Sequence, residues 1–188
     1  MSSDHPTDDP SEPADPAVGD ASLPELIRER GELLLEALEA EMPGSTERAD
    51  AVAAFALATA VGLGFDRAQA ELCRQTARLA DIGKLYGPAE THYEAGAQLA
   101  RGAGVPMVAC DWLLGVAEHY DGSGPAALSG AEIPVFSRII RAAKGCDEIV
   151  SAGGAPGELR ALTGGELDPA MVDALARMLE RAESQPRE

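Results

Sequence analysis

Apolar residues in this chain recur at the three- and four-residue spacing of one helix face, in segments that glycine and proline separate. The first such stripe consists of Leu26, Ile27, Leu33, Leu34 and Leu38, and a Met-Pro-Gly break follows it. Alanine and leucine dominate the apolar residues, whereas aromatic residues make up only 4% of the chain. Helices favour alanine and leucine, while strands favour aromatic and β-branched side chains. The pattern therefore predicts an all-α fold.

About seven helices are expected, and two of them carry clear start signals. Ser22 and Glu25 have the spacing of a capping box, and Asp168 precedes a proline that suits the first helical turn. Turn-forming residues at 121–134 and a Gly-Gly-Ala-Pro break at 153–156 separate the later helices. The expected helices cover residues 22–41, 45–62, 66–81, 91–102, 106–120 and 135–151, with a final one from 168 onward.

The two ends of the chain differ from the rest in composition. Residues 1–22 contain four prolines, six acidic residues and no basic residue. Such a segment buries too little apolar surface to offset the entropy lost on ordering, so it is predicted to be a disordered acidic, proline-rich tail. We expect one folded domain at 23–183 and a short disordered C-terminus at 184–188.

Charge and hydropathy limit the partners and the compartment. The formal net charge is −17, a poor electrostatic match for nucleic acid or an anionic membrane. No run approaches the roughly 18–20 apolar residues of a transmembrane helix, and the N-terminus does not resemble a signal peptide. We therefore expect a cytoplasmic protein with no nucleic-acid or membrane partner. Cys73, Cys110 and Cys146 are isolated in the sequence and are expected to be buried free thiols.

Two short segments resemble known signatures. Residues 79–85 read Leu-Ala-Asp-Ile-Gly-Lys-Leu, and residues 118–125 read Glu-His-Tyr-Asp-Gly-Ser-Gly-Pro. The first resembles the His-Asp-Ile-Gly-Lys signature of HD-domain metal phosphohydrolases, and the second resembles the later signature of their HD-GYP subfamily. Residues 128–140 and 165–169 extend the similarity in the same order. The chain thus resembles a degenerate HD-GYP member, which implies an HD-domain-like helical bundle.

The resemblance also implies where metal ions would bind, because the family holds divalent metals between its helices with histidine and carboxylate side chains. At these positions only Asp81 and His92 keep a donor in this chain. Two donors do not suffice to assign a catalytic residue, and no metal or other cofactor is expected. The positions where the family has a donor and this chain does not are Arg48, Ala80, Val116, Ala117 and Lys144. The remnant signature positions are Asp81, Lys84, Glu118 and Asp121.

Lys84 and Lys144 are the two lysines of the chain, and both fall at signature positions. Loss of the metals would leave the Asp81 carboxylate buried without a positive charge, at a cost of several kcal/mol. We hypothesise that Lys144 or Lys84 forms an ion pair with Asp81 in place of the metal. The alternative is that Lys144 points to solvent.

Three functions remain open at this stage. The first is a catalytically inactive regulatory module that binds a protein partner, such as a signalling protein, or a ligand, in bacterial cyclic-nucleotide signalling. The second is a residual metal-dependent phosphohydrolase with a single Mn, Fe or Zn ion on Asp81 and His92, helped by Glu118 or Asp121. The third is a metal-free cyclic-dinucleotide sensor that binds phosphate through Lys84, Arg138 and Arg141. A homodimer is also open, because the first helix could cover the core or pair with a copy of itself.

Overall fold

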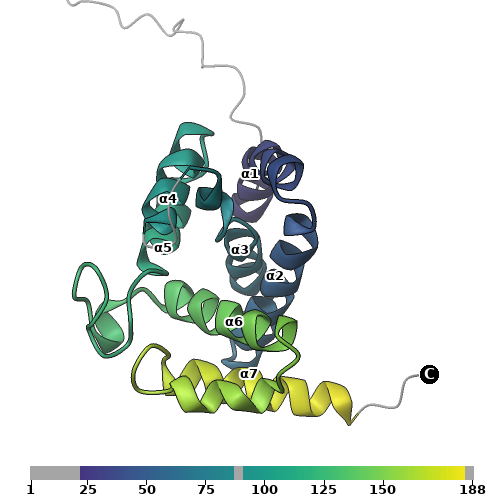
Figure 1. The fold of residues 1–188 in the computed structure, drawn as a ribbon, viewed down its shortest axis with the longest axis vertical. Coiled ribbons are helices and arrows are strands. Elements are labelled where there is room, and N and C mark those ends of the chain that lie inside the picture. Colours follow the sequence, from purple (N-terminus) through teal and green to yellow (C-terminus); the bar gives the residue numbers. More distant parts are fainter. Residues whose placement is uncertain (1–21, 87–90, 185–188) are drawn as a thin grey trace, which may run out of the picture.

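The computed structural model describes residues 22–86 and 91–184, and these form seven α-helices and three short 3-10 helices (Figure 1). The predicted all-α bundle of about seven helices is confirmed. The predicted disordered segments at the two ends lie almost wholly outside the described residues. The elements are α1 (Leu23–Glu41), α2 (Ser45–Gly62), α3 (Arg67–Arg78), η1 (Ile82–Leu85), α4 (His92–Gly102), α5 (Met107–Gly115), η2 (Gly130–Glu132), α6 (Val135–Ser151), η3 (Pro156–Leu162) and α7 (Pro169–Glu183).

Helix α2 is the centre of the bundle, since it packs against α1, α3, α6 and α7. Figure 1 shows α6 and α7 crossing below the ends of α2 and α3. Helices α4 and α5 pair with each other on the side of α3 that faces away from α2. Three alanines of α2, Ala53, Ala56 and Ala60, are almost fully buried, so neighbouring helices can approach its backbone closely. Ile139 and Ile140 of α6 fill the same core with no exposed surface. None of the helices in the described residues is long and apolar enough to cross a membrane.

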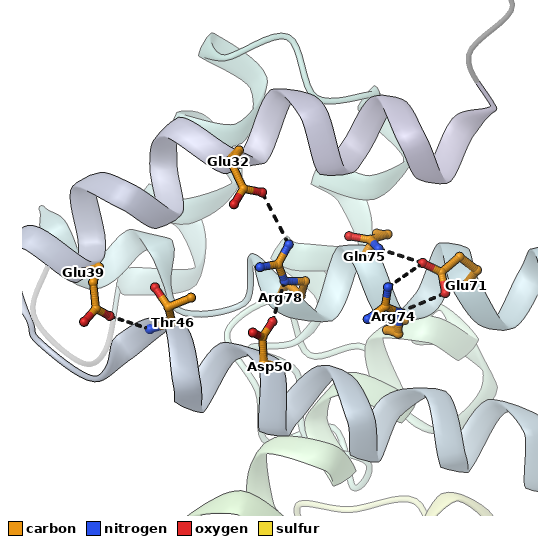
Figure 2. A network of polar contacts seen from close by, with 8 residues as sticks. All are labelled: Glu32, Glu39, Thr46, Asp50, Glu71, Arg74, Gln75 and Arg78. Atoms are coloured by element: carbon orange, nitrogen blue, oxygen red, sulfur yellow. Dashed lines mark hydrogen bonds and ion pairs between the residues drawn. The ribbon is translucent and has the colours of Figure 1, made fainter.

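Arg78 joins three helices at the end of α3 (Figure 2). Its guanidinium lies 2.7 Å from a carboxylate oxygen of Asp50 on α2 and 3.5 Å from one of Glu32 on α1. The predicted capping box of α1 is also present, because the Glu25 carboxylate accepts hydrogen bonds from the backbone N–H and the hydroxyl of Ser22. The two Arg78 contacts link α3 to α1 and α2 immediately before the signature at 79–85.

Two helices end earlier than the sequence predicted. The third was expected to reach Asp81 but ends at Arg78, where i→i+3 hydrogen bonds tighten the chain into η1. The fifth was expected to reach Tyr120 but ends at Gly115. There the Glu118 carboxylate accepts hydrogen bonds from the backbone of the following loop, which turns the chain away from the helix axis.

A close backbone approach holds η1 against α4. A Cβ atom added at Gly83 would lie 1.7 Å from the carbonyl oxygen of His92, so no side chain fits there. Gly96, one turn further along α4, lies against the same glycine. This contact places His92, the first residue of α4, beside the signature segment. The three cysteines are buried free thiols, as predicted.

Candidate functional site

Two lysines meet the Asp81 carboxylate, which lies between the end of α3 and η1. The Lys144 ammonium, from α6, donates a hydrogen bond to Oδ1 of Asp81, and the Lys84 ammonium lies 3.0 Å from Oδ2. The Lys144 side chain is only 6% exposed, against 31% for Lys84. The predicted ion pair is therefore present with both lysines, and Lys144 does not point to solvent.

The positive charges around Asp81 oppose the effect of burial on the pKa of its carboxyl group. Burial raises the pKa of the Asp81 carboxyl, but the Lys144 and Lys84 ammonium groups outweigh this effect and hold the pKa below its ordinary value. The Lys144 ammonium also lies 5.6 Å from the centre of the Tyr93 ring, within the range of a cation–π contact. Burial raises the pKa of Tyr93, so this ring stays neutral and presents its face to the cation. Asp81 is accordingly an anion at neutral pH with two cations in contact.

A second ion pair lies alongside, between Arg48 of α2 and Asp147 of α6. The Arg48 guanidinium donates two hydrogen bonds to one carboxylate oxygen of Asp147, at 2.7 and 3.1 Å. Asp147 is buried, and the hydrogen bond to it raises the pKa of Arg48 despite the opposing effect of burial. Sequence reasoning did not assign this pair. The available signal was that Asp147 follows Lys144 by three residues and so lies on the same face of α6.

His92 remains beside Asp81, although it is not within hydrogen-bond distance of it. Its Nε2 atom lies 3.9 Å from Oδ1 of Asp81, the same oxygen that Lys144 contacts. The imidazole is buried, and its ring centre lies 3.9 Å from that of Tyr93. The two surviving donors of the family pattern are thus brought together, with the Lys144 ammonium on one of them.

Glu118 and Asp121 are engaged in local structure. The buried Glu118 carboxylate accepts hydrogen bonds from the backbone N–H groups of Ala126 and Leu128. The exposed Asp121 carboxylate accepts one from the backbone of Ser123, which closes an Asx turn. Both signature positions therefore order the loop after α5.

Arg138 and Arg141, predicted to bind a phosphate together with Lys84, each have an acidic partner in the structure. Arg138 pairs with Asp168 at 2.5 Å and donates a second hydrogen bond to a backbone carbonyl. Arg141 pairs with Glu166 at 2.9 Å. The three cations do not line one cavity, since Lys84 and Arg141 line different ones.

Two small cavities flank the ion pairs. One, of about 250 Å³, has Arg48, Asp81 and Lys84 in its wall, and the other, of about 200 Å³, has His92, Lys144 and Arg141. Both are smaller than the roughly 300–1,000 Å³ usual for small-molecule sites. The paired side chains lie between the two, so the region is a packed charged layer.

The donor set does not fit the metal centre that the resemblance implies. Within residues 22–86 and 91–184 no group of three or more His, Cys, Asp or Glu side chains is arranged to hold a metal ion. Asp81 and His92 are the neighbouring donors, and a metal on Asp81 would have to displace the Lys144 ammonium. A catalytic zinc site, for comparison, uses three protein ligands.

No family model matches the sequence, and no curated protein matches it. Solved structures do match. A cyclic GMP-AMP-specific phosphodiesterase of V. cholerae has a TM-score of 0.65 and 19% identity, over 86% of this chain and 49% of that one. This chain has an HD-domain fold. It spans about half the length of the V. cholerae protein.

Two further structures support the same fold. An HD-GYP-type protein of Bdellovibrio bacteriovorus has a TM-score of 0.64 and 16% identity, over 88% of this chain and 75% of that one. The HD domain of the L. monocytogenes phosphodiesterase PgpH, solved with cyclic di-AMP, has a TM-score of 0.59 and 17% identity, over 83% of this chain and 99% of that one. The fold implied by the two signature segments is confirmed.

Proposed function

We propose that this chain is a non-hydrolytic HD-fold module that acts by binding a protein partner. The observation that carries the proposal is the Lys144 ammonium, which lies against the Asp81 carboxylate where the family resemblance implies a metal ion. An ammonium group neutralises a carboxylate and donates hydrogen bonds to it. It offers no coordination position at which water could become a hydroxide nucleophile near neutral pH.

The surrounding charges support a structural role for the site. Arg48 and Lys144 each neutralise a carboxylate, and the Arg48–Asp147 pair ties α2 to α6. The ammonium and guanidinium groups would thereby hold together the helices that a metal centre would otherwise link. Hydrolysis of a phosphodiester needs, in addition, a polarised water and stabilisation of the charge on phosphorus. In our proposal, no side chain at the site polarises a water molecule for attack on the phosphodiester.

In our proposal a protein partner is favoured over a cyclic dinucleotide, because of the state of the three cations that could bind phosphate. Lys84, Arg138 and Arg141, the cations that could bind phosphate, are all paired with acidic side chains. A dinucleotide would have to break these pairs and enter against the field of a chain of net charge −17. By analogy with the phosphodiesterases of similar fold, the proposed setting is regulation of bacterial signalling in the cytoplasm.

Hydrolysis assays test the proposal directly. The purified chain is incubated with cyclic di-GMP, cyclic GMP-AMP or cyclic di-AMP in the presence of Mn²⁺ or Fe²⁺, and the V. cholerae phosphodiesterase serves as the positive control for cyclic GMP-AMP. We expect no product from this chain. Metal-dependent turnover that disappears in Asp81→Ala and His92→Ala would overturn the proposal and support a residual phosphohydrolase.

Calorimetry with the same three dinucleotides separates a partner-binding module from a metal-free sensor. We expect no measurable heat of binding. Saturable binding that weakens in both Lys84→Ala and Arg141→Ala would identify a sensor instead. Asp173→Ala, a change at an exposed position on α7, is the matched control, since it lies on neither cavity.

A further inference from the structure

A cavity between the start of α1 and α3 lies apart from the ion-paired site. Its volume is about 520 Å³, within the range of roughly 300–1,000 Å³ usual for ligand sites. None of its lining residues belongs to the two cavities beside the ion pairs. Three arginines and two glutamates lie in its wall, so cations outnumber anions there, although the whole chain has a net charge of −17.

Gln75, which lines this cavity, has a buried amide oxygen that lacks a hydrogen-bond donor. The residue is only 3% exposed, and its side chain lies on the side of α3 nearer to α1 (Figure 2). Its Nε2 donates a hydrogen bond of 2.7 Å to the Glu71 carboxylate, and this contact fixes the orientation of the amide because an ionised carboxylate only accepts. The remaining atom, Oε1, meets no donor in the part of the chain that the structure describes. A buried acceptor in this state lowers stability, and a molecule bound in the cavity can supply the donor.

The three arginines of the wall differ in how they are engaged. Arg74 donates two hydrogen bonds of 2.9 Å to the Glu71 carboxylate, and these lower the pKa of Glu71. Arg28 and Arg67 are exposed, and neither forms an ion pair with another described residue. Both guanidinium groups are thus open to an anion from outside the domain. Clusters of arginine are a general means of binding acidic segments of proteins.

We propose that this cavity binds an extended acidic peptide segment of a protein partner, with carboxylates on Arg28 and Arg67 and a backbone N–H on Gln75. Arg67 and Gln75 are eight residues apart on α3, which corresponds to about 12 Å along the helix. An extended peptide covers this distance with about four residues, each of which offers an N–H unless it is proline. A single small anion does not reach both ends. The inference rests on the proposed function for the existence of a partner and adds the chemistry of the segment that binds.

The first test uses the capped peptide Ac-Asp-Ala-Ala-Asp-NH2, titrated into the full-length ¹⁵N-labelled chain and followed by NMR. Saturable shifts are expected at backbone amides around the cavity and none on α7. The neutral peptide Ac-Asn-Ala-Ala-Asn-NH2 is expected to leave the spectrum unchanged. Equal shifts with the two peptides, or no saturable shift with the acidic one, would overturn the inference. Inorganic phosphate that reproduces the same shifts would also overturn it, since the cavity would then be a simple anion site.

Variants of the chain test the two kinds of contact separately. Arg67→Ala is expected to weaken peptide binding about fivefold, the upper range for an exposed ion pair. Arg177→Ala removes the same charge from an exposed position on α7 and is the matched control, so it is expected to bind as wild type does. Gln75→Leu removes the buried acceptor and is also expected to weaken binding about fivefold, with unchanged circular dichroism. Wild-type affinity in both Arg67→Ala and Gln75→Leu would contradict the proposed contacts.

The peptide itself can be changed where the protein is not. In three further peptides an ester replaces one backbone amide at a time, which removes one N–H and keeps both carboxylates. One of these esters is expected to bind wild type about fivefold more weakly and to bind Gln75→Leu as the parent peptide does. Equal affinity of all the peptides for wild type would show that no N–H reaches Gln75. Such a failure leaves the hydrolysis test unaffected, because the cavity shares no residue with the Asp81 site.

Discussion

At the residue scale, the centre of this molecule is one carboxylate with two unequal cations. Lys144 and Lys84 both contact Asp81, but the Lys144 side chain is almost fully enclosed while that of Lys84 is partly hydrated. A buried charge that loses its partner leaves the other charge uncompensated, whereas an exposed partner is replaced by water. The two lysines should therefore differ greatly in their contribution to stability.

Replacing each lysine by methionine tests this difference. Lys144→Met leaves the Asp81 carboxylate, which is 17% exposed, with Lys84 as its remaining ion-pair partner, and we expect it to lower the free energy of unfolding by about 3 kcal/mol. Lys84→Met removes the more exposed contact and is expected to cost no more than about 1 kcal/mol. Urea unfolding monitored by circular dichroism gives both values. Equal losses in the two variants would mean that Lys144 is not the principal counter-charge of Asp81.

The pH dependence of stability reports on the same carboxylate. The pKa of Asp81 in the folded chain lies below its ordinary value of 3.8, so the folded state binds fewer protons than the unfolded state near that pH. The stabilisation by the ionised group is thus complete above the unfolded pKa and is lost as pH falls through the folded pKa.

We therefore expect wild type to exceed Asp81→Asn in free energy of unfolding by an amount that is constant at neutral pH. This excess should shrink once the pH falls below about 4. Urea unfolding of the two proteins over this pH range provides the measurement. A difference that stays constant down to the lowest pH would show that ionisation of Asp81 is not coupled to folding.

At the scale of the elements, the helices follow from local sequence and the contacts between them do not. Apolar periodicity and capping residues predict all seven α-helices, because both signals act within a few residues of the chain. The Lys144–Asp81 pair is also predictable, since both residues fall at signature positions. The Arg48–Asp147 pair joins positions 99 residues apart and depends on how α2 packs on α6. The early end of α3 comes from local i→i+3 hydrogen bonds, and that of α5 from hydrogen bonds between Glu118 and the loop that follows it, neither of which the apolar periodicity reports.

The contact between η1 and α4 leaves no room for a side chain at Gly83 of the signature. A methyl group there would overlap the carbonyl oxygen of His92, so η1 and α4 would have to separate. We expect Gly83→Ala to lower the free energy of unfolding by about 3 kcal/mol or more, the upper range for overpacking. Gly157→Ala is the matched control, because a Cβ at that position meets nothing within 4 Å. The melting temperatures of both variants, measured by thermal unfolding, test this prediction. Similar melting temperatures would show that the close approach of η1 to α4 is absent.

At the scale of the whole molecule, we propose that this chain keeps the HD-domain fold without a metal-dependent hydrolytic site. The helical framework matches two phosphodiesterases and an HD-GYP-type protein over most of this chain. Its core is filled by apolar side chains, to which α2, α3 and α6 contribute many. The charged layer beside that core joins helices through ammonium and guanidinium groups. We therefore predict that the domain folds independently of divalent metal.

The most direct test is the metal content per chain, measured by mass spectrometry on protein purified without chelators or a histidine tag. We predict far less than one iron, manganese or zinc ion per chain, and a melting temperature that a chelator does not change. Near-stoichiometric metal that is lost in Asp81→Ala or His92→Ala would contradict the account, because a metal would then occupy the place assigned to Lys144.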